Sequence, residues 1–251
     1  MKSALRLAAI AFLPVLVGTA HATVTETFKQ TYPLAADGTV SVDNVNGDIT
    51  ITGWDKAEVS LEAEKSAKDD EDLKRIELVI EAKPDRLEIK TKYAKKSGWS
   101  LFGNNSGSVR YKLMVPAGVR LDKIDSVNSD ITVTDVHGPV NLDTVNGRVR
   151  ATGLMADARL DSVNGNLSAG FVSLDKVDKV KLDSVNGRAE VILPKGASAR
   201  IDADSVNGGV SVDQAIKLGK TGHHSLKGEI GSGGPLISLD TVNGSIAIRE
   251  K

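Results

Sequence analysis

The sequence predicts an all-β protein, built as a single-chain β-solenoid (a β-helix) with rungs of about 18–22 residues. Three observations predict this fold. A phrase of the type Leu-Asp-Ser-Val-Asn-Gly occurs seven times, the residues flanking it alternate between apolar and polar, and aromatic side chains make up only 4% of the chain. A repeat of about 20 residues is typical of stacked rungs, and period-two alternation is typical of half-buried strands. We expect the coil to be right-handed.

Residues 1–22 have the pattern of a secretory signal peptide. Lys2 and Arg6 precede an apolar run over residues 7–17, and Ala20-His21-Ala22 forms an A-x-A site. The run is shorter than the roughly 20 apolar residues of a membrane-spanning helix. We therefore expect cleavage near Ala22 and a protein that is exported to the periplasm or the cell surface.

Composition narrows the class of partner. The chain has no cysteine, which excludes disulfides, thiolate zinc sites and a lipid-modified N-terminal cysteine. Removing the two basic residues of the signal peptide changes the formal net charge from −1 to −3. We expect no nucleic-acid partner, because such proteins present a basic face.

Residues 23–120 are predicted to be a strand-rich cap that contains the first rung. Apolar residues alternate around positions 59–63, 78–82, 87–91 and 109–121, and "AKPDRL" places a Pro-Asp turn between two of these strands. A short helix is expected in "SAKDDEDLKRIEL", with Ser66 as its N-cap. Such a cap protects the open sheet edge that a solenoid would otherwise expose.

Residues 121–251 are predicted to be the solenoid repeats, continuous with the cap. The residue numbers of successive motif asparagines differ by 82, 18, 18, 22, 21 and 36, and the last gap suggests a degenerate copy near Ser225. A two-residue Asn-Gly hairpin would pair apolar with polar residues on both faces, so we predict a corner between two strands, with the motif valine inward. Glycine and asparagine tolerate positive φ at such a corner. We expect the asparagine amides to stack as a hydrogen-bonded ladder, which comprises Asn46, Asn128, Asn146, Asn164, Asn186, Asn207 and Asn243.

Each motif copy also carries an aspartate three residues before its asparagine. Neighbouring carboxylates must be solvated, paired or metal-bound, because they repel one another by roughly 1 kcal/mol. One interpretation is that each carboxylate accepts hydrogen bonds from backbone N–H groups two residues on. The alternative is a calcium ladder at Asp125, Asp143, Asp161 and Asp183, although the glycine-rich calcium β-roll signature is absent and we predict no metal.

The irregular stretch "KYAKKSGWSLFGNNSGSVRY" is the candidate binding loop. It concentrates aromatic and basic residues, of which Tyr93, Lys95, Lys96, Trp99 and Phe102 are the candidate binding residues. Exposed aromatics beside cations are common at binding hot spots. The alternative is that Trp99 and Phe102 fold back over the end of the solenoid.

Four segments resemble an exported bacterial β-strand-repeat family labelled "putative adhesin". They are "GTVSVDNVNGDITITGWDKAEVSLEAEKSA", "DRLEIKTKY", "YKLMVPAGVRL" and "GEIGSGGPLISLDTVNGSIAI". This family of unknown function is related to head-GIN-type domains. The resemblance extends over nearly the whole mature chain and implies a single-chain β-helix in the cell envelope, without catalytic residues.

Two functions from different classes remain. The first is a non-enzymatic envelope protein, an adhesin-like binding rod or scaffold whose partner is an envelope protein or a polysaccharide. The second is a carbohydrate-active β-helix enzyme, a polysaccharide lyase or hydrolase. We favour the first and expect no cofactor, because no zinc-spaced histidines, phosphate loop or nucleophile elbow is present and the acids are periodic.

Overall fold

A computed structural model describes residues 23–94, 107–213 and 216–251, so the predicted signal peptide lies outside the described residues. The described chain is almost entirely β-structure. In chain order the elements are β1 (Val24–Pro33), β2 (Thr39–Asp43), β3 (Ile49–Trp54), β4 (Glu58–Ala67), α1 (Asp70–Lys74), β5 (Ile76–Lys83), β6 (Arg86–Tyr93), β7 (Ser108–Pro116), β8 (Arg120–Asn128), β9 (Ile131–Thr134), β10 (Val140–Asn146), β11 (Val149–Asn164), β12 (Leu167–Asn186), β13 (Ala189–Leu193), β14 (Ala199–Asn207), β15 (Val210–Val212), β16 (Ile216–Thr221), β17 (Ser225–Ile230), β18 (Leu236–Asn243) and β19 (Ile246–Glu250).

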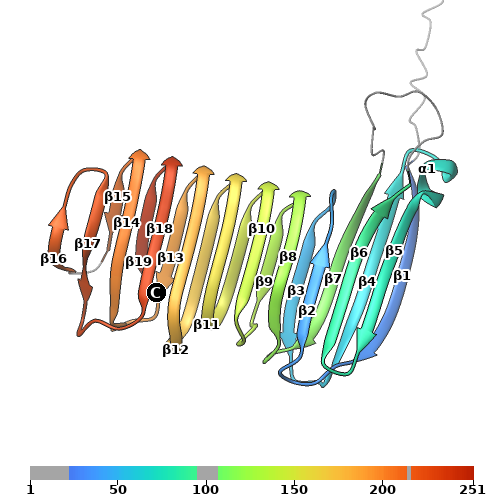
Figure 1. Cartoon of the computed structure of the whole chain (residues 1–251), viewed down its shortest axis with the longest axis horizontal. Helices are drawn as coiled ribbons and strands as arrows, with labels where there is room; N and C mark the ends of the chain where they lie inside the picture. Colours follow the sequence, from blue (N-terminus) through green and yellow to red (C-terminus); the bar gives the residue numbers. More distant parts are fainter. Residues whose placement is uncertain (1–22, 95–106, 214–215) are drawn as a thin grey trace, which may run out of the picture.

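The strands form one continuous hydrogen-bonded sheet that coils into a flattened solenoid, and its two facing layers are each called a sheet below (Figure 1). We call the sheet that carries the repeated motif the motif sheet; its strand order is β5-β6-β2-β8-β10-β11-β12-β18-β14-β17-β16. The facing return sheet has the order β1-β4-β7-β3-β9-β11-β12-β13-β19-β15. The long strands β11 and β12 bend from one sheet into the other. The predicted all-β solenoid architecture is therefore confirmed.

The core is a thin apolar layer between the two sheets. Alternate side chains of each strand point into it, such as Leu160 and Leu182 from the motif sheet and Val149 and Leu167 from the return sheet, all at most 1% exposed. Burying a side chain of this kind stabilises the fold by roughly 1.5–3 kcal/mol. Most of the core residues are aliphatic, with Tyr111 and Phe171 as the large aromatic exceptions.

The N-terminal end is closed by antiparallel strands and a short helix. β4 and β7 extend the return sheet and β6 and β5 extend the motif sheet, while α1 contacts β1, β4 and β5. The Pro84-Asp85 turn joins β5 to β6 as predicted. The helix is present, but its N-cap is Asp69, whose carboxylate accepts a 2.8 Å hydrogen bond from the Asp72 N–H. The Ser66 prediction was wrong because β4 continues through that residue.

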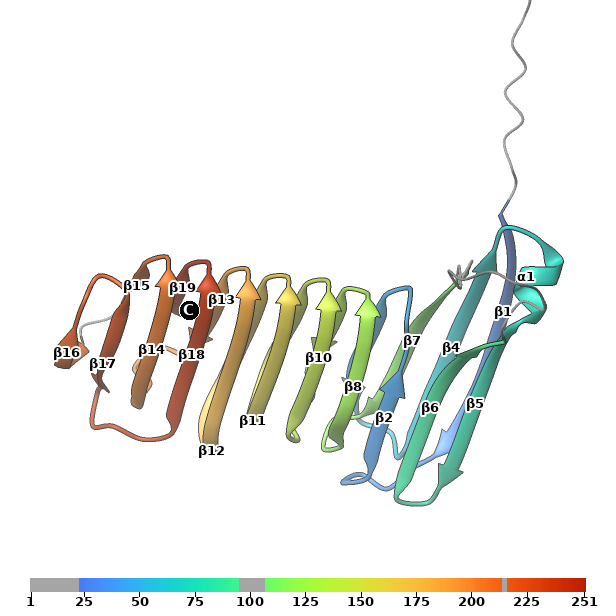
Figure 2. The same ribbon diagram turned by 45° about the horizontal axis from the view of Figure 1, so that its top comes forward.

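The C-terminal end differs from the sequence prediction in two ways. There is no degenerate rung near Ser225, because β16 and β17 form an antiparallel hairpin that pairs with β14. In addition, the strands that come last in the chain do not lie last in the stack. β18 lies between β12 and β14, and β19 lies between β13 and β15 (Figure 2).

Candidate functional site on the motif sheet

The repeated motif forms the end of β8, β10, β11, β12, β14 and β18 and begins in the last residues of β2, and its side chains alternate without interruption up to the corner. The serine or threonine before the valine points inward; Ser184 and Thr241 are about 5% exposed. The valine points outward, and six of the seven are 37–65% exposed. The expectation that the motif valine points inward was therefore wrong. The strand continues through the asparagine, so the turn begins after it.

The buried hydroxyls are accommodated because each has a hydrogen-bond partner, which is the Ser129 hydroxyl for Ser126 and a backbone carbonyl of the neighbouring rung for the other five. Ser184 Oγ donates to the Gly165 carbonyl oxygen at 3.1 Å, and Ser205 Oγ donates to that of Gly244 at 2.9 Å. A buried hydroxyl without such a partner would be strongly unfavourable. In the first rung Asn44 takes this position, and its Nδ2 donates to the carbonyl oxygens of Gly47 and Val109.

The motif glycine is required mainly by close approach between rungs. A Cβ at Gly165 would lie 1.7 Å from the Gly147 carbonyl oxygen, and one at Gly187 would lie 2.0 Å from that of Gly165. Gly165 and Gly187 do not adopt positive φ, nor does any motif asparagine. The positive-φ explanation therefore holds for Gly47, whose φ is +102°, but fails for Gly165 and Gly187, where steric contact with the neighbouring carbonyl replaces it.

The asparagine amides form a continuous row of hydrogen bonds along the solenoid. In six of the seven asparagines Nδ2 donates to the Oδ1 of the asparagine in the next rung, with distances of 2.8–3.0 Å, whereas Asn46 Nδ2 donates to the Gly107 carbonyl oxygen at 3.2 Å. In stacking order the row runs Asn207, Asn243, Asn186, Asn164, Asn146, Asn128 and Asn46. All the bonds point the same way, so the row holds the rungs in register at the corner.

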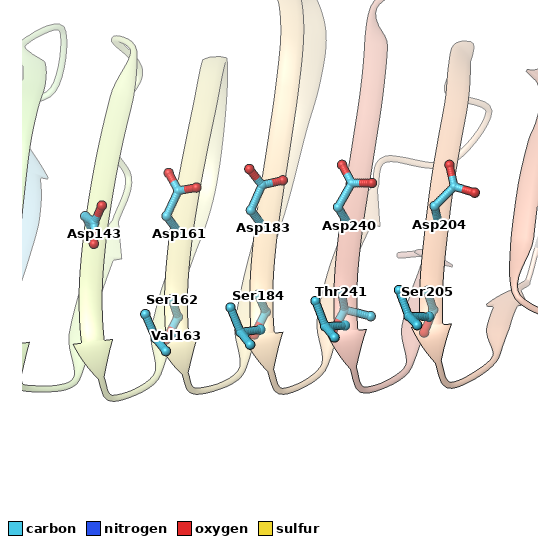
Figure 3. A pocket seen from close by; sticks show the side chains of 13 residues that line it. Asp143, Asp161, Ser162, Val163, Asp183, Ser184, Asp204, Ser205, Asp240 and Thr241 are labelled. Atoms are coloured by element: carbon cyan, nitrogen blue, oxygen red, sulfur yellow. The ribbon is translucent and has the colours of Figure 1, made fainter.

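Beside this row, the outer face of β10, β11, β12, β18 and β14 carries a shallow groove of about 610 Å³. Two parallel stripes line it, one of aspartates and one of exposed valines. Figure 3 shows the five aspartates side by side on neighbouring strands, in the order Asp143, Asp161, Asp183, Asp240 and Asp204. The four valines are Val163, Val185, Val242 and Val206. Because the strands are hydrogen-bonded neighbours, both stripes repeat about every 4.8 Å.

The aspartates are only partly compensated by basic residues. Arg159 Nε lies 2.8 Å from the Asp161 carboxylate, and Lys181 pairs with Asp183. Asp240 instead accepts a 3.2 Å hydrogen bond from Ser238 Oγ. In the described residues none of the motif carboxylates bonds to the backbone N–H two residues on, so the Asx-type interpretation was wrong.

Burial and neighbouring negative charges raise the pKa values of several motif aspartates. Burial, reinforced by the neighbouring Asp183 and Asp143 charges, raises the pKa of Asp161 to about 6 against the opposing effect of Arg159. The pKa values of Asp125 and Asp240 are raised in the same way, first by burial and then by neighbouring carboxylates. The groove therefore favours positive charge or hydrogen-bond donors in whatever lies on it.

The same face continues into a second, smaller groove of about 340 Å³ toward the start of the strands. Arg120, Arg159, Lys179 and Lys181 line it together with acidic residues, of which Asp157 accepts hydrogen bonds from the backbone N–H groups of residues 178 and 179. Arg159 and Lys181 thus separate a basic region from the aspartate stripe. The outer motif sheet is a regular surface of apolar, acidic and basic stripes.

Comparison with known proteins identifies the family of this repeat. The Toastrack DUF4097 family matches residues 29–249. The chain belongs to the Toastrack DUF4097 family. This assignment agrees with the resemblance to an adhesin-labelled family of unknown function that the motifs suggested. No match is found among curated proteins.

Solved structures similar to this Toastrack chain include two proteins named for adhesion. A "putative cell adhesion protein" from Clostridium sporogenes ATCC 15579 is 16% identical over 90% of this chain and 100% of its own, with a TM-score of 0.50. A "putative adhesin" from Bacteroides fragilis NCTC 9343 is 14% identical over 90% and 97%, with a TM-score of 0.40. At this identity the first similarity shows the fold alone.

Most of the predicted binding loop of this Toastrack chain lies outside the described residues. That applies to Lys95, Lys96, Trp99 and Phe102. Tyr93, at the end of β6, is half-buried, and burial raises its pKa to about 12. The valine stripe was missed by sequence reasoning, although strict period-two alternation from the buried apolar residue that precedes each motif aspartate would have placed it outward.

The described residues show neither a metal centre nor a membrane-spanning helix. Within residues 23–94, 107–213 and 216–251, no group of three or more histidine, aspartate or glutamate side chains is arranged to hold a metal ion, and this includes the candidate calcium row from Asp125 to Asp183. No helix of this described part is long and apolar enough to cross a membrane.

Proposed function

We propose that this Toastrack chain is a non-enzymatic binding protein of the bacterial cell envelope, a rod whose motif sheet docks an extended partner along the groove between β10 and β14. The observation that carries the proposal is the pairing of an exposed valine stripe with an under-compensated aspartate stripe. Exposed apolar stripes rimmed by charge mark interaction surfaces. Their constant spacing suits a partner that makes the same contact at successive rungs.

The chemistry of the groove favours a protein partner with basic side chains. Valines supply apolar contact, and carboxylates with raised pKa values gain most from a positive neighbour. No aromatic side chain lines the groove, and aromatic faces are what sugar rings most often stack on. An envelope protein is therefore preferred to a polysaccharide.

The test is binding of purified protein to solubilised cell envelope from the source bacterium, measured by biolayer interferometry. The double variant Val163→Lys/Val185→Lys places two cations in the groove and should reduce binding at least tenfold. Arg150→Glu, an exposed residue of β11 on the return sheet, is the matched control and should bind normally. Both variants must retain the wild-type melting temperature.

Digesting the envelope separates the partner classes. Protease treatment should abolish binding, whereas periodate oxidation of sugars should not. Loss of binding after periodate treatment, but not after protease treatment, would identify the partner as a polysaccharide instead. Equal binding by wild type and the groove variant would refute the groove as the docking site.

A second function is supported by one observation, the proton affinity of Asp161. The strands that carry neighbouring aspartates are about 4.8 Å apart, which is compatible with the roughly 5 Å between the two carboxyl groups of a retaining glycosidase. With a pKa of about 6, Asp161 can act as a general acid while a neighbouring carboxylate is ionised. Release of reducing ends from envelope polysaccharides that is lost in Asp161→Asn would establish this activity. Absence of any release across a glycan panel would exclude it.

A further inference from the structure

The final two strands occupy a slot between earlier rungs. β18 pairs in parallel with β12 along one edge and with β14 along the other, and β19 pairs likewise with β13 and β15. Figures 1 and 2 show this pair, in red, between strands of the preceding part of the chain. Without β18 and β19, four strands would each present an unpaired edge.

The contacts that hold this pair in the slot are those of the repeat itself. Thr241 Oγ1 donates to the Gly187 carbonyl oxygen at 3.2 Å, and Ser205 Oγ donates to that of Gly244. The Asn243 amide donates to Asn186 at 2.8 Å and accepts from Asn207 at 2.9 Å. Such contacts depend on the motif and the register, so they are the same whichever copy of the chain supplies the strands.

The covalent connections leave the order of these rungs open. The connection from Asn164 to Asn186 has nearly the same length as the connection from Asn186 to Asn207. The first pair nevertheless lies in adjacent rungs, whereas the second pair lies two rungs apart. Connections of nearly equal length thus bridge one rung spacing or two. The segment that leads into β18 contains Gly231 and Gly233 with φ of +61° and +79°, a conformation that glycine adopts far more readily than other residues.

We propose that the slot is a strand-exchange site for a second copy of this chain. Two copies exchange β18 and β19 reciprocally, so that each slot is filled by the partner's strands through the same hydrogen bonds. Since the contacts are unchanged, the balance between monomer and exchanged dimer depends on the hinge at residues 231–235 and on concentration. A short hinge of this kind gives the resident strands an effective concentration on the order of millimolar. The monomer therefore dominates in dilute solution, and exchange appears on refolding at high concentration.

Cysteine cross-linking tests the exchange, because the chain has no cysteine of its own. Lys181 and Ser238 are register partners across the β12–β18 boundary. Lys181→Cys and Ser238→Cys are prepared separately, unfolded together, refolded at about millimolar concentration and oxidised. A disulfide-linked dimer of the two variants is expected, at least fivefold above the yield when Arg150→Cys replaces Lys181→Cys.

The double variant Lys181→Cys/Ser238→Cys, refolded in dilute solution, is the positive control and should close an internal disulfide in the monomer. If it does so while the mixed single variants give only the background of the Arg150→Cys control, the slot accepts its own strands alone and the proposal is overturned.

Shortening the hinge gives an independent test. Deleting Gly233 and Gly234 should keep β18 from reaching its own slot, and the mass measured by light scattering should double. A folded monomer whose β18–β19 segment remains protected from proteolysis would contradict strand exchange.

Discussion

The asparagine row makes a graded prediction for stability. Asn164 lies inside the row and makes two of its hydrogen bonds, to Asn146 at 2.9 Å and from Asn186 at 2.8 Å, whereas Asn207 at the end makes one. Each such bond contributes about 0.5–1 kcal/mol, since the exposed amides left behind can bond to water. Asn164→Ala should therefore lower the free energy of unfolding by about 1–2 kcal/mol, and Asn207→Ala by about half as much.

Urea denaturation followed by far-UV circular dichroism measures these differences. Asn141→Ala is the matched control, because Asn141 lies on the outer face of β10 and its amide has no hydrogen-bond partner in the described part of the chain. It should change stability by less than about 0.5 kcal/mol. If Asn164→Ala costs no more than Asn141→Ala, or no more than Asn207→Ala, the row does not hold the rungs together.

The motif side chains carry three further predictions. Ser184→Ala should lower the free energy of unfolding by about 1 kcal/mol in thermal denaturation, because the hydrogen bond from Ser184 Oγ to the Gly165 carbonyl oxygen is lost. Val185→Ser should change it by less than about 0.5 kcal/mol, because Val185 is exposed. A larger loss in Val185→Ser than in Ser184→Ala would mean that the valine is buried. Gly165→Ala should lower the free energy of unfolding in urea by about 2–3 kcal/mol, because the added Cβ would overlap the backbone carbonyl of Gly147. Gly209→Ala is the control and should fold normally, since a Cβ at Gly209 would have no atom within 4 Å. Equal losses of stability in the two variants would argue against close contact between rungs. The folded state holds the Asp161 proton more tightly than the unfolded state, so the contribution of Asp161 to stability should become more favourable as pH falls from about 7 to about 4. Asp161→Asn should therefore gain about 1–2 kcal/mol relative to wild type at pH 8, about half of that at pH 5 and little below about pH 4. Urea midpoints that show a gain independent of pH would contradict the raised pKa.

Repetition made the architecture predictable from sequence. Seven copies of one phrase with alternating flanks left few arrangements besides stacked rungs, and the invariant asparagine pointed to stacked amides. These features depend on local pattern, which the sequence displays directly. The same holds for the Pro84-Asp85 turn and the short acidic helix.

The predictions that were wrong concern positions where tertiary contacts, and not the polarity of the residue, decide where a side chain or a strand lies. Val185 was assigned inward because it is apolar, yet the inward position belongs to the preceding Ser184, whose buried hydroxyl donates a hydrogen bond to the Gly165 carbonyl oxygen. The insertion of β18 between β12 and β14 could not be predicted, because Leu239 to Gly244 is nearly identical to the other copies and carries no mark of its place in the stack. The groove was missed for the same reason as the valines.

The candidate site therefore moves from the loop around Trp99 to the regular face of the solenoid. The loop residues from Lys95 to Phe102 stay a prediction, because they lie outside the described part of the chain. The groove has the advantage that five rungs contribute to it, so weak contacts can add along its length.

The central claim is that the motif sheet, and not the return sheet, meets the partner. The most direct measurement is photo-cross-linking in living cells of the source bacterium, with a photoreactive amino acid placed at Val163 or at Arg150, two exposed positions of the same strand β11 on opposite sheets. We predict one discrete, protease-sensitive adduct from Val163 and none from Arg150. An adduct of the same size from both positions, or from Arg150 alone, would contradict the assignment of the binding face.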